Sequence, residues 1–116
     1  MIPSEDLMIG NYVFDNFDAK NPYKITRISL DDFVAMSNGC NSYQPIPLTE
    51  DILLKCGFYE HKKWFTNDYI TLGYITDDRW MQFEYSVSRS VIDIKYLHQL
   101  QNLYFALKNK ELQVKL

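Results

Sequence analysis

The chain has 116 residues, a formal net charge of −3 and an apolar fraction of 47%, which together predict a single ordered domain, residues 1–116. This acidic balance makes nucleic-acid binding a poor expectation, because such affinity comes mainly from neutralised phosphates. No stretch approaches the ~18 to 20 apolar residues that cross a bilayer, and residues 1–10 lack the basic and apolar regions of a signal peptide. We therefore expect a cytoplasmic protein without a membrane partner.

The N-terminal third predicts short antiparallel strands. Residues 11–14 and 23–29 alternate between apolar and polar side chains, as half-buried strands do. The segment between them is rich in Asn and Asp and ends at Pro22, which is typical of a loop. These features predict a hairpin with a long acidic loop. After a turn at residues 31–32, the apolar residues 33–36 predict a third short strand.

Residues 45–58 carry the clearest local helix signal. Thr49 is a typical N-cap residue, and Glu50 and Asp51 place negative charge in the first turn, where the helix dipole favours it. Gly57 is positioned to adopt the left-handed conformation just past the helix end. The pattern predicts a helix of about two turns, which is too short to form without tertiary packing.

The rest of the chain predicts further strands and a final helix. Four more segments predict strands, residues 64–66, 69–75, 79–87 and 91–95, and in residues 79–87 apolar side chains alternate with a mixed set. Residues 96–110 contain no Gly or Pro and carry an apolar stripe at helical spacing, formed by Leu97, Leu100, Tyr104 and Leu107. The predicted fold class is α+β: a small twisted, mostly antiparallel sheet of about five to seven strands, one short middle helix and one C-terminal amphipathic helix.

No group of residues typical of a catalytic or metal site is visible. The two imidazoles, His61 and His98, lack the C-x-x-C or H-x-x-x-H spacing of metal ligands. A glycine-rich phosphate loop and a G-x-S-x-G motif are also absent. Because no export signal is present, Cys40 and Cys56 are expected to be free thiols rather than a disulfide. We expect no catalytic residue, no metal and no cofactor, although a catalytic site assembled from scattered residues stays open.

The C-terminal helix offers a first set of candidate binding residues. His98, Asn102 and Phe105 lie at i, i+4 and i+7 beside the apolar stripe, and Gln101 is next to them. Amides around an aromatic ring suit a protein interface. The alternative is that Phe105 only widens the face of the helix that packs on the core.

Tyr74 and Trp80 are a second candidate pair, on two predicted strands. Aromatic side chains of this kind stack on bases or nucleotide rings. They also form cross-strand pairs that stabilise a sheet without binding anything. The sequence leaves both interpretations open.

Three blocks of the chain together resemble one known family. They are residues 45–58 (PIPLTEDILLKCGF), residues 94–107 (IKYLHQLQNLYFAL) and the opening residues 9–13 (IGNYV). In these blocks the chain is similar to a family of small uncharacterised proteins from gut bacteria and their phages. The resemblance implies a phage or prophage origin, and hence the cytoplasm of a host cell, but it implies no activity, ligand or catalytic residue.

Two functions follow as expectations. The first is a non-catalytic phage-type or prophage-type accessory protein that acts by binding a protein partner. The alternative is a protein that binds or sequesters a nucleotide or another small molecule, using aromatic rings with Arg79 or Arg89 in a pocket or at an interface between copies of the chain. A homo-oligomer is compatible with either function.

Overall fold

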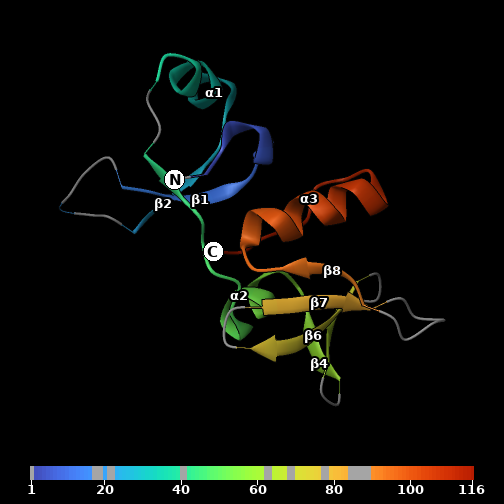
Figure 1. The fold of residues 1–116 in the computed structure, drawn as a ribbon. Coiled ribbons are helices and arrows are strands. Elements are labelled where there is room, and N and C mark those ends of the chain that lie inside the picture. Colours follow the sequence, from blue (N-terminus) through green and yellow to red (C-terminus); the bar gives the residue numbers. More distant parts are fainter. Residues whose placement is uncertain are drawn as a thin grey trace. The chain divides into compact units, whose positions relative to one another are not determined.

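The structure is a computed structural model that describes residues 2–16, 20, 23–39, 42–61, 64–67, 70–76, 79–83 and 90–116. Within these residues the chain forms eight strands, three α-helices and one 3-10 helix, which confirms the predicted α+β class (Figure 1). Contacts divide the chain into unit 1, Met1–Ile46 with Tyr96–Leu103, and unit 2, Pro47–Lys95 with Tyr104–Leu116. One helix supplies residues to both units, so the assignment of a single domain stays a prediction.

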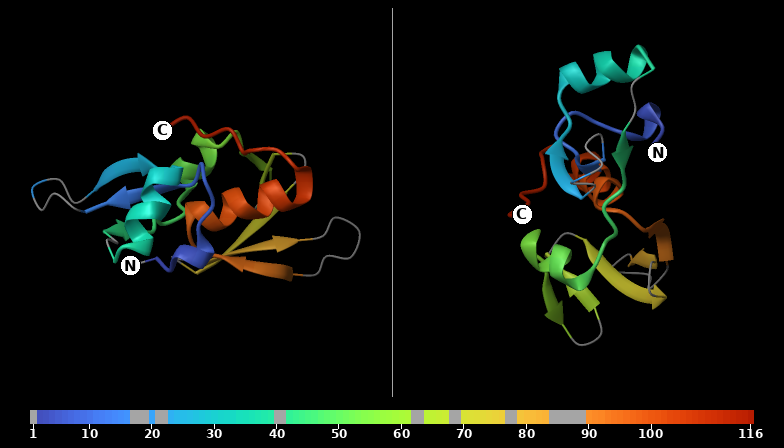
Figure 2. Two further views of the ribbon diagram at one scale, coloured as in Figure 1. Left: turned by 90° about the horizontal axis from the view of Figure 1, so that it is seen from above. Right: turned by 90° about the vertical axis from the view of Figure 1, so that its left-hand side faces the viewer.

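Unit 1 is built on a three-stranded antiparallel sheet with the strand order β2-β1-β3. Its elements are η1 (Ser4–Asp6), β1 (Tyr12–Asp15), β2 (Lys24–Arg27), α1 (Leu30–Ser37), β3 (Tyr43–Gln44) and the first part of α3 (Leu97–Lys108). The predicted hairpin is confirmed, because β1 and β2 pair over their full length, with Tyr12 opposite Arg27 and Asp15 opposite Lys24. Figure 2 shows the two strands side by side.

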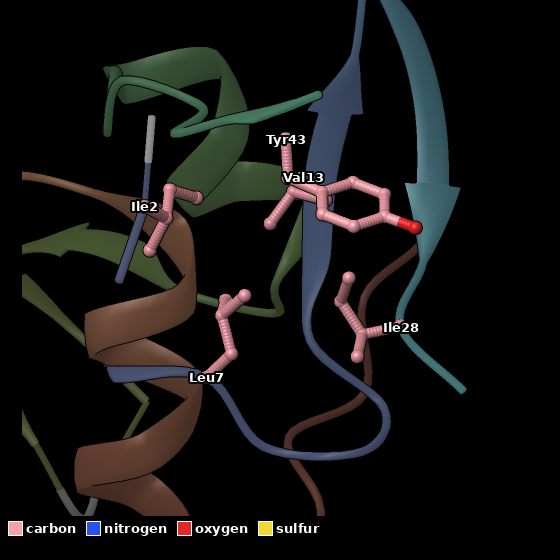
Figure 3. Close-up of a cluster of buried hydrophobic side chains, with 5 residues drawn as sticks. All are labelled: Ile2, Leu7, Val13, Ile28 and Tyr43. Atoms are coloured by element: carbon pink, nitrogen blue, oxygen red, sulfur yellow. The ribbon is translucent and has the colours of Figure 1, made fainter. Parts of the chain in front are cut away.

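The core of unit 1 lies on one face of this sheet. Its buried side chains come from the N-terminal segment and from β1, the residue after β2, and β3 (Figure 3): Ile2, Leu7, Val13, Ile28 and Tyr43. Phe33 and Met36 of α1 pack against this cluster. Full burial of one aliphatic side chain stabilises a fold by ~1.5 to 3 kcal/mol, so this cluster supplies much of what orders the hairpin.

Residues 33–36 belong to α1, so the strand predicted there is wrong. Asp32 Oδ2 accepts hydrogen bonds from Ser29 N (2.7 Å) and Ser29 Oγ (2.8 Å), and Asp32 Oδ1 accepts one from the Tyr43 hydroxyl. Burial raises the pKa of Asp32, but these hydrogen bonds lower it by more, so the pKa lies below its ordinary value. The N-terminal cap that Asp32 forms starts a helix where a turn was predicted.

Unit 2 contains a five-stranded antiparallel sheet in which the strands follow in chain order, β4-β5-β6-β7-β8. Its elements are α2 (Glu50–Lys55), β4 (Tyr59–His61), β5 (Trp64–Thr66), β6 (Thr71–Thr76), β7 (Arg79–Phe83), β8 (Ser90–Ile94) and the end of α3. The strand predicted at residues 64–66 is confirmed, and the strands predicted at 69–75, 79–87 and 91–95 are confirmed over most of their described residues, whereas residues 69 and 84–87 lie outside the described residues. The strands of the chain are therefore divided between two sheets of three and five strands instead of forming one.

The helix α2 begins and ends as the sequence predicts. Thr49 Oγ1 accepts a hydrogen bond from Ile52 N (3.3 Å) and so caps the N-terminus. At the other end, Gly57 has a φ of 84°, and its N–H donates to Leu54 O (3.2 Å) while Phe58 N donates to Leu53 O (3.0 Å). This pair of bonds is the Schellman motif, which satisfies carbonyls that the helix leaves open.

The C-terminal helix α3 is also confirmed, and most of its predicted stripe is buried. Leu97, Leu100 and Tyr104 are buried; the two leucines belong to unit 1 and Tyr104 belongs to unit 2. Leu107, the fourth residue of the stripe, is exposed. Among the described helices, none combines the length and hydrophobicity that crossing a membrane requires.

Candidate functional site

Two of the four candidate residues on α3 are buried, and both belong to unit 1. His98 is 3% exposed and Gln101 is 8% exposed, whereas Asn102 is half-buried. Phe105 lies beyond them on the part of α3 that belongs to unit 2, and it is 38% exposed. The proposed role of these residues in binding stays a prediction, but the side chains of Gln101 and Asn102 have partners within the chain.

Gln101 binds the backbone of the segment that leads into β1. Its Oε1 accepts a hydrogen bond from Tyr12 N (2.8 Å), and its Nε2 donates one to Gly10 O (3.1 Å). These two groups flank Asn11. In a parallel sheet, one residue of a neighbouring strand bonds the same pair, the C=O before and the N–H after the residue opposite it. Because β3 pairs only with Phe14 and Asp15, the Gln101 amide completes this edge of β1.

Asn11 and Asn102 form a second polar link next to the first. Asn11 Nδ2 donates to Asn102 Oδ1 (2.9 Å), and Asn11 Oδ1 accepts from Met8 N (2.7 Å). Asn102 Nδ2 in turn donates to Asp6 O (3.0 Å). The sequence carries no local signal for Asn11, which is buried, because its partner lies 91 positions away.

His98 is the one described residue with a buried side-chain polar atom, Nδ1, that lacks a hydrogen-bond partner. Its ring stacks on Tyr96 with centroids 5.8 Å apart and planes 9° apart. Burial lowers the pKa of His98, and the negative charge of Asp6 opposes this shift only in part. The imidazole is therefore neutral at physiological pH.

The other residues considered from the sequence do not form a site among the described residues. Tyr74 and Trp80 lie opposite each other in β6 and β7, as a cross-strand pair would, and only their backbone positions are described. Cys56 is a free, buried thiol, and burial raises its pKa to about 12, so it is not a nucleophile at neutral pH. Cys40 and Arg89 lie outside the described residues.

No cluster that could hold a metal ion is present among the residues the structure describes. Exposed aromatic and aliphatic side chains in unit 1 lie on the β1–β2 hairpin. Its side chains alternate with those of the core cluster and so lie on the opposite face of the sheet. We call this surface the hairpin face and define it by Tyr12, Phe14, Tyr23, Ile25 and Arg27.

The hairpin face is exposed but held in place by contacts between its own side chains. Tyr23 is 74% exposed and Ile25 is 44% exposed, whereas Tyr12 and Phe14 are half-buried. The ring of Tyr23 meets that of Phe14 edge-on, with centroids 5.5 Å apart. These contacts restrict the rings before any ligand binds, which lowers the entropic cost of recognition.

Arg27 gives the hairpin face its one positive charge. Its guanidinium carbon lies 5.7 Å from the centroid of the Tyr12 ring, at the distance of a cation–π contact. The two residues are directly opposite each other in the strand register. The face therefore combines aromatic surface with a positioned cation.

A signal for the hairpin face was present in the sequence. The alternation of residues 11–14 and 23–29 predicts that Tyr12 shares a face with Phe14, and Tyr23 with Ile25. It does not say which face packs on the core, because both faces carry apolar residues. The burial of Val13 and Ile28 decides the question and leaves the aromatic face open.

No family model matches the chain, and neither a curated protein nor a solved structure shows significant similarity to it.

Proposed function

We propose that this chain is a non-catalytic protein that acts by binding a protein partner through the hairpin face. The observation that supports this most directly is the exposure of Tyr23 and Ile25 on the side of the sheet opposite the core. Exposed aromatic rings held at fixed positions resemble the anchors that dominate the binding energy of protein interfaces. The resemblance to proteins of gut bacteria and their phages supports a phage-type or prophage-type accessory role in the host cytoplasm.

The test compares two exposed apolar pairs within unit 1. The hairpin-face variant carries Tyr23→Thr and Ile25→Thr, because Thr favours strand conformation at both positions. The control variant carries Leu30→Ala and Val34→Ala, which remove an exposed apolar pair from α1. Both variants should keep the unfolding midpoint of the unchanged protein within a few degrees, because these side chains are largely exposed.

The readout is capture from a lysate of gut bacteria, followed by calorimetric titration with each captured protein after purification. We expect one partner that binds the unchanged chain and the α1 control, and that loses about tenfold or more in affinity for the hairpin-face variant. A partner that binds both variants alike would place the interface elsewhere. Absence of any captured protein that binds after purification would contradict the proposal.

A second candidate function, binding of a nucleotide, is favoured by the position of Arg27. A guanidinium beside aromatic rings can hold a phosphate while a base stacks on a neighbouring ring. A ligand at ~100 times its dissociation constant stabilises a fold by ~2.7 kcal/mol. A thermal-shift series with nucleoside mono-, di- and triphosphates should therefore raise the unfolding midpoint if this candidate is correct, and Arg27→Leu should abolish the shift. No shift with any nucleotide would rule it out.

A further inference from the structure

The three-stranded sheet of unit 1 has an edge without a neighbouring strand. On one side of β1 lie β3 and the Gln101 side chain. On the other side β2 is the outermost strand, and no further strand pairs with it among the described residues. Lys24, Ile25 and Arg27 of this strand are exposed. An edge strand of this kind is a template for pairing with another chain.

The hydrogen-bond alternation fixes which backbone groups of β2 point to this edge. Ile28 N donates to Asn11 O (2.7 Å), and Gly10 N donates to Ile28 O (2.8 Å), so the backbone groups of Ile28 point to the β1 side. Successive residues of an antiparallel strand direct these groups to alternate sides. Thr26 therefore also points to β1, and the N–H and C=O of Ile25 point outward.

Only a few registers let a second copy of β2 pair antiparallel with this edge. Outward-pointing residues must lie opposite each other, so Ile25 of one copy lies opposite Tyr23, Ile25 or Arg27 of the other. When Tyr23 is opposite, Lys24 lies opposite Lys24, and these like charges repel. When Arg27 is opposite, Lys24 lies beside the buried Ile28, which is an unfavourable position for a charge. The register with Ile25 opposite Ile25 avoids both contacts.

We propose that the chain forms a symmetric dimer in which β2 pairs antiparallel with β2 of a second copy, with Ile25 opposite Ile25 at the two-fold axis. The N–H of each Ile25 donates to the C=O of the other. On the hairpin face, Tyr23 of each copy lies opposite Arg27 of the other, so an aromatic ring meets a cation at two symmetric positions. On the core face, Lys24 lies opposite Thr26.

The dimer joins the two hairpin faces into one continuous surface, because residues opposite each other in a sheet point to the same side. It needs no other protein and so goes beyond the proposed function. A short strand edge buries less area than a standard interface, so we expect a weak dimer with a dissociation constant on the order of 0.1 mM. Sedimentation equilibrium of the full chain up to ~1 mM measures this constant. In the same range, NMR should show concentration-dependent shifts at the amides of β2.

The first test removes the outward-pointing donor. Ile25→Pro deletes the N–H of residue 25, which makes no bond to β1, and proline is tolerated on an edge strand for that reason. This variant should be monomeric at all concentrations. The control is Ile25→Val, which keeps the donor and a β-branched side chain and should dimerise within about threefold of the unchanged chain. Dispersed amide signals from β1 verify that each variant is folded.

The second test checks the register through one charge. Tyr23→Glu places a carboxylate opposite Arg27 of the other copy, whereas Tyr23→Lys places a like charge there. We expect the Glu variant to dimerise about tenfold more tightly than the Lys variant. Net charge alone predicts the reverse order, because the chain already carries −3 and the Glu variant is the more acidic of the two.

Three results would overturn the inference: no association up to ~1 mM, association that leaves the β2 amides unshifted, or a Glu variant no tighter than the Lys variant. Dimerisation of a folded Ile25→Pro variant equal to that of Ile25→Val would also overturn it. A chain that stays monomeric but captures a protein through the hairpin face would leave the proposed function standing. A β2 dimer without any captured protein would do the opposite.

Discussion

At the scale of single residues, the side chain of Gln101 replaces a missing stretch of β-strand. The Gln101→Leu variant keeps the size of the side chain but leaves Tyr12 N–H and Gly10 C=O without partners. A buried polar group that loses its partner costs about 1 to 3 kcal/mol, so the two groups together should lower the free energy of unfolding by about 2 to 6 kcal/mol. Urea denaturation measures it. The control is Gln113→Leu at an exposed position, which should change stability by less than about 0.5 kcal/mol. Equal effects of the two variants would show that the Gln101 bonds add no stability.

The buried imidazole of His98 gives stability a dependence on pH. Because burial lowers the pKa of His98 in the folded state, the unfolded chain takes up a proton first as pH falls below about 6.5. The folded state is therefore favoured above that pH and loses free energy of unfolding as pH falls towards the lowered folded pKa. We expect His98→Phe to flatten this part of the stability profile, measured by urea unfolding from pH 8 to pH 5. A profile unchanged by the substitution would assign the acid sensitivity to other groups.

At the scale of elements, the end of α2 depends on the backbone conformation of Gly57. With a φ of 84° and nothing within 4 Å of an added Cβ, a side chain at this position meets only conformational strain. Gly57→Ala should therefore destabilise the protein by about 1 to 2 kcal/mol, the cost of a left-handed residue with a Cβ. Gly57→Asn should cost less, because Asn tolerates this conformation. Thermal unfolding ranks the stability of the two variants. An equal loss of stability in both would point to a steric cause instead of conformational strain.

The two shorter helices show what the sequence can and cannot predict. The limits of α2 were predicted because Thr49 and Gly57 act through bonds to residues within five positions in the chain. The helix α1 was missed because Asp32 was interpreted as a turn residue, although its spacing from Ser29 is that of a capping pair. The apolar residues that follow are compatible with either a strand or a helix. The capping pair was therefore the only local indication of a helix.

The contacts between α3 and the start of β1 could not be predicted from the sequence, for a different reason. The amides of Gln101 and Asn102 are polar and stand beside an apolar stripe, so the pattern predicts a surface position. Their burial depends on Gly10 and Asn11, which lie 91 positions away and satisfy those amides. No local pattern encodes such a pairing. For the same reason the sequence could not show that the hairpin face is the exposed face of the sheet.

At the scale of the whole molecule, α3 is common to both units. A variant that ends at residue 96 removes the buried residues Leu97 and Leu100, which belong to unit 1, and the buried residues Tyr104 and Leu112, which belong to unit 2. Truncating one buried Leu to Ala already costs about 2 to 5 kcal/mol, which is comparable with the total stability of a small domain. We therefore expect neither unit to fold in this variant.

Proton NMR tests this expectation, because a folded unit gives dispersed amide signals. Removal of Leu116 alone is the control and should leave the spectrum unchanged, since its side chain is exposed. Dispersed signals from β1 and β2 in the variant that ends at residue 96 would show that unit 1 forms without α3.

The bond between Gln101 and the start of β1 also sets an order of events during synthesis. A ribosome translates Gly10 first and Gln101 91 residues later, and at ~5 to 20 residues per second this interval is about 5 to 18 s. Throughout that time the backbone groups of Gly10 and Tyr12 lack the Gln101 amide that closes this part of the edge of β1. This part of the strand edge is therefore accessible to chaperones and proteases until the last helix leaves the exit tunnel.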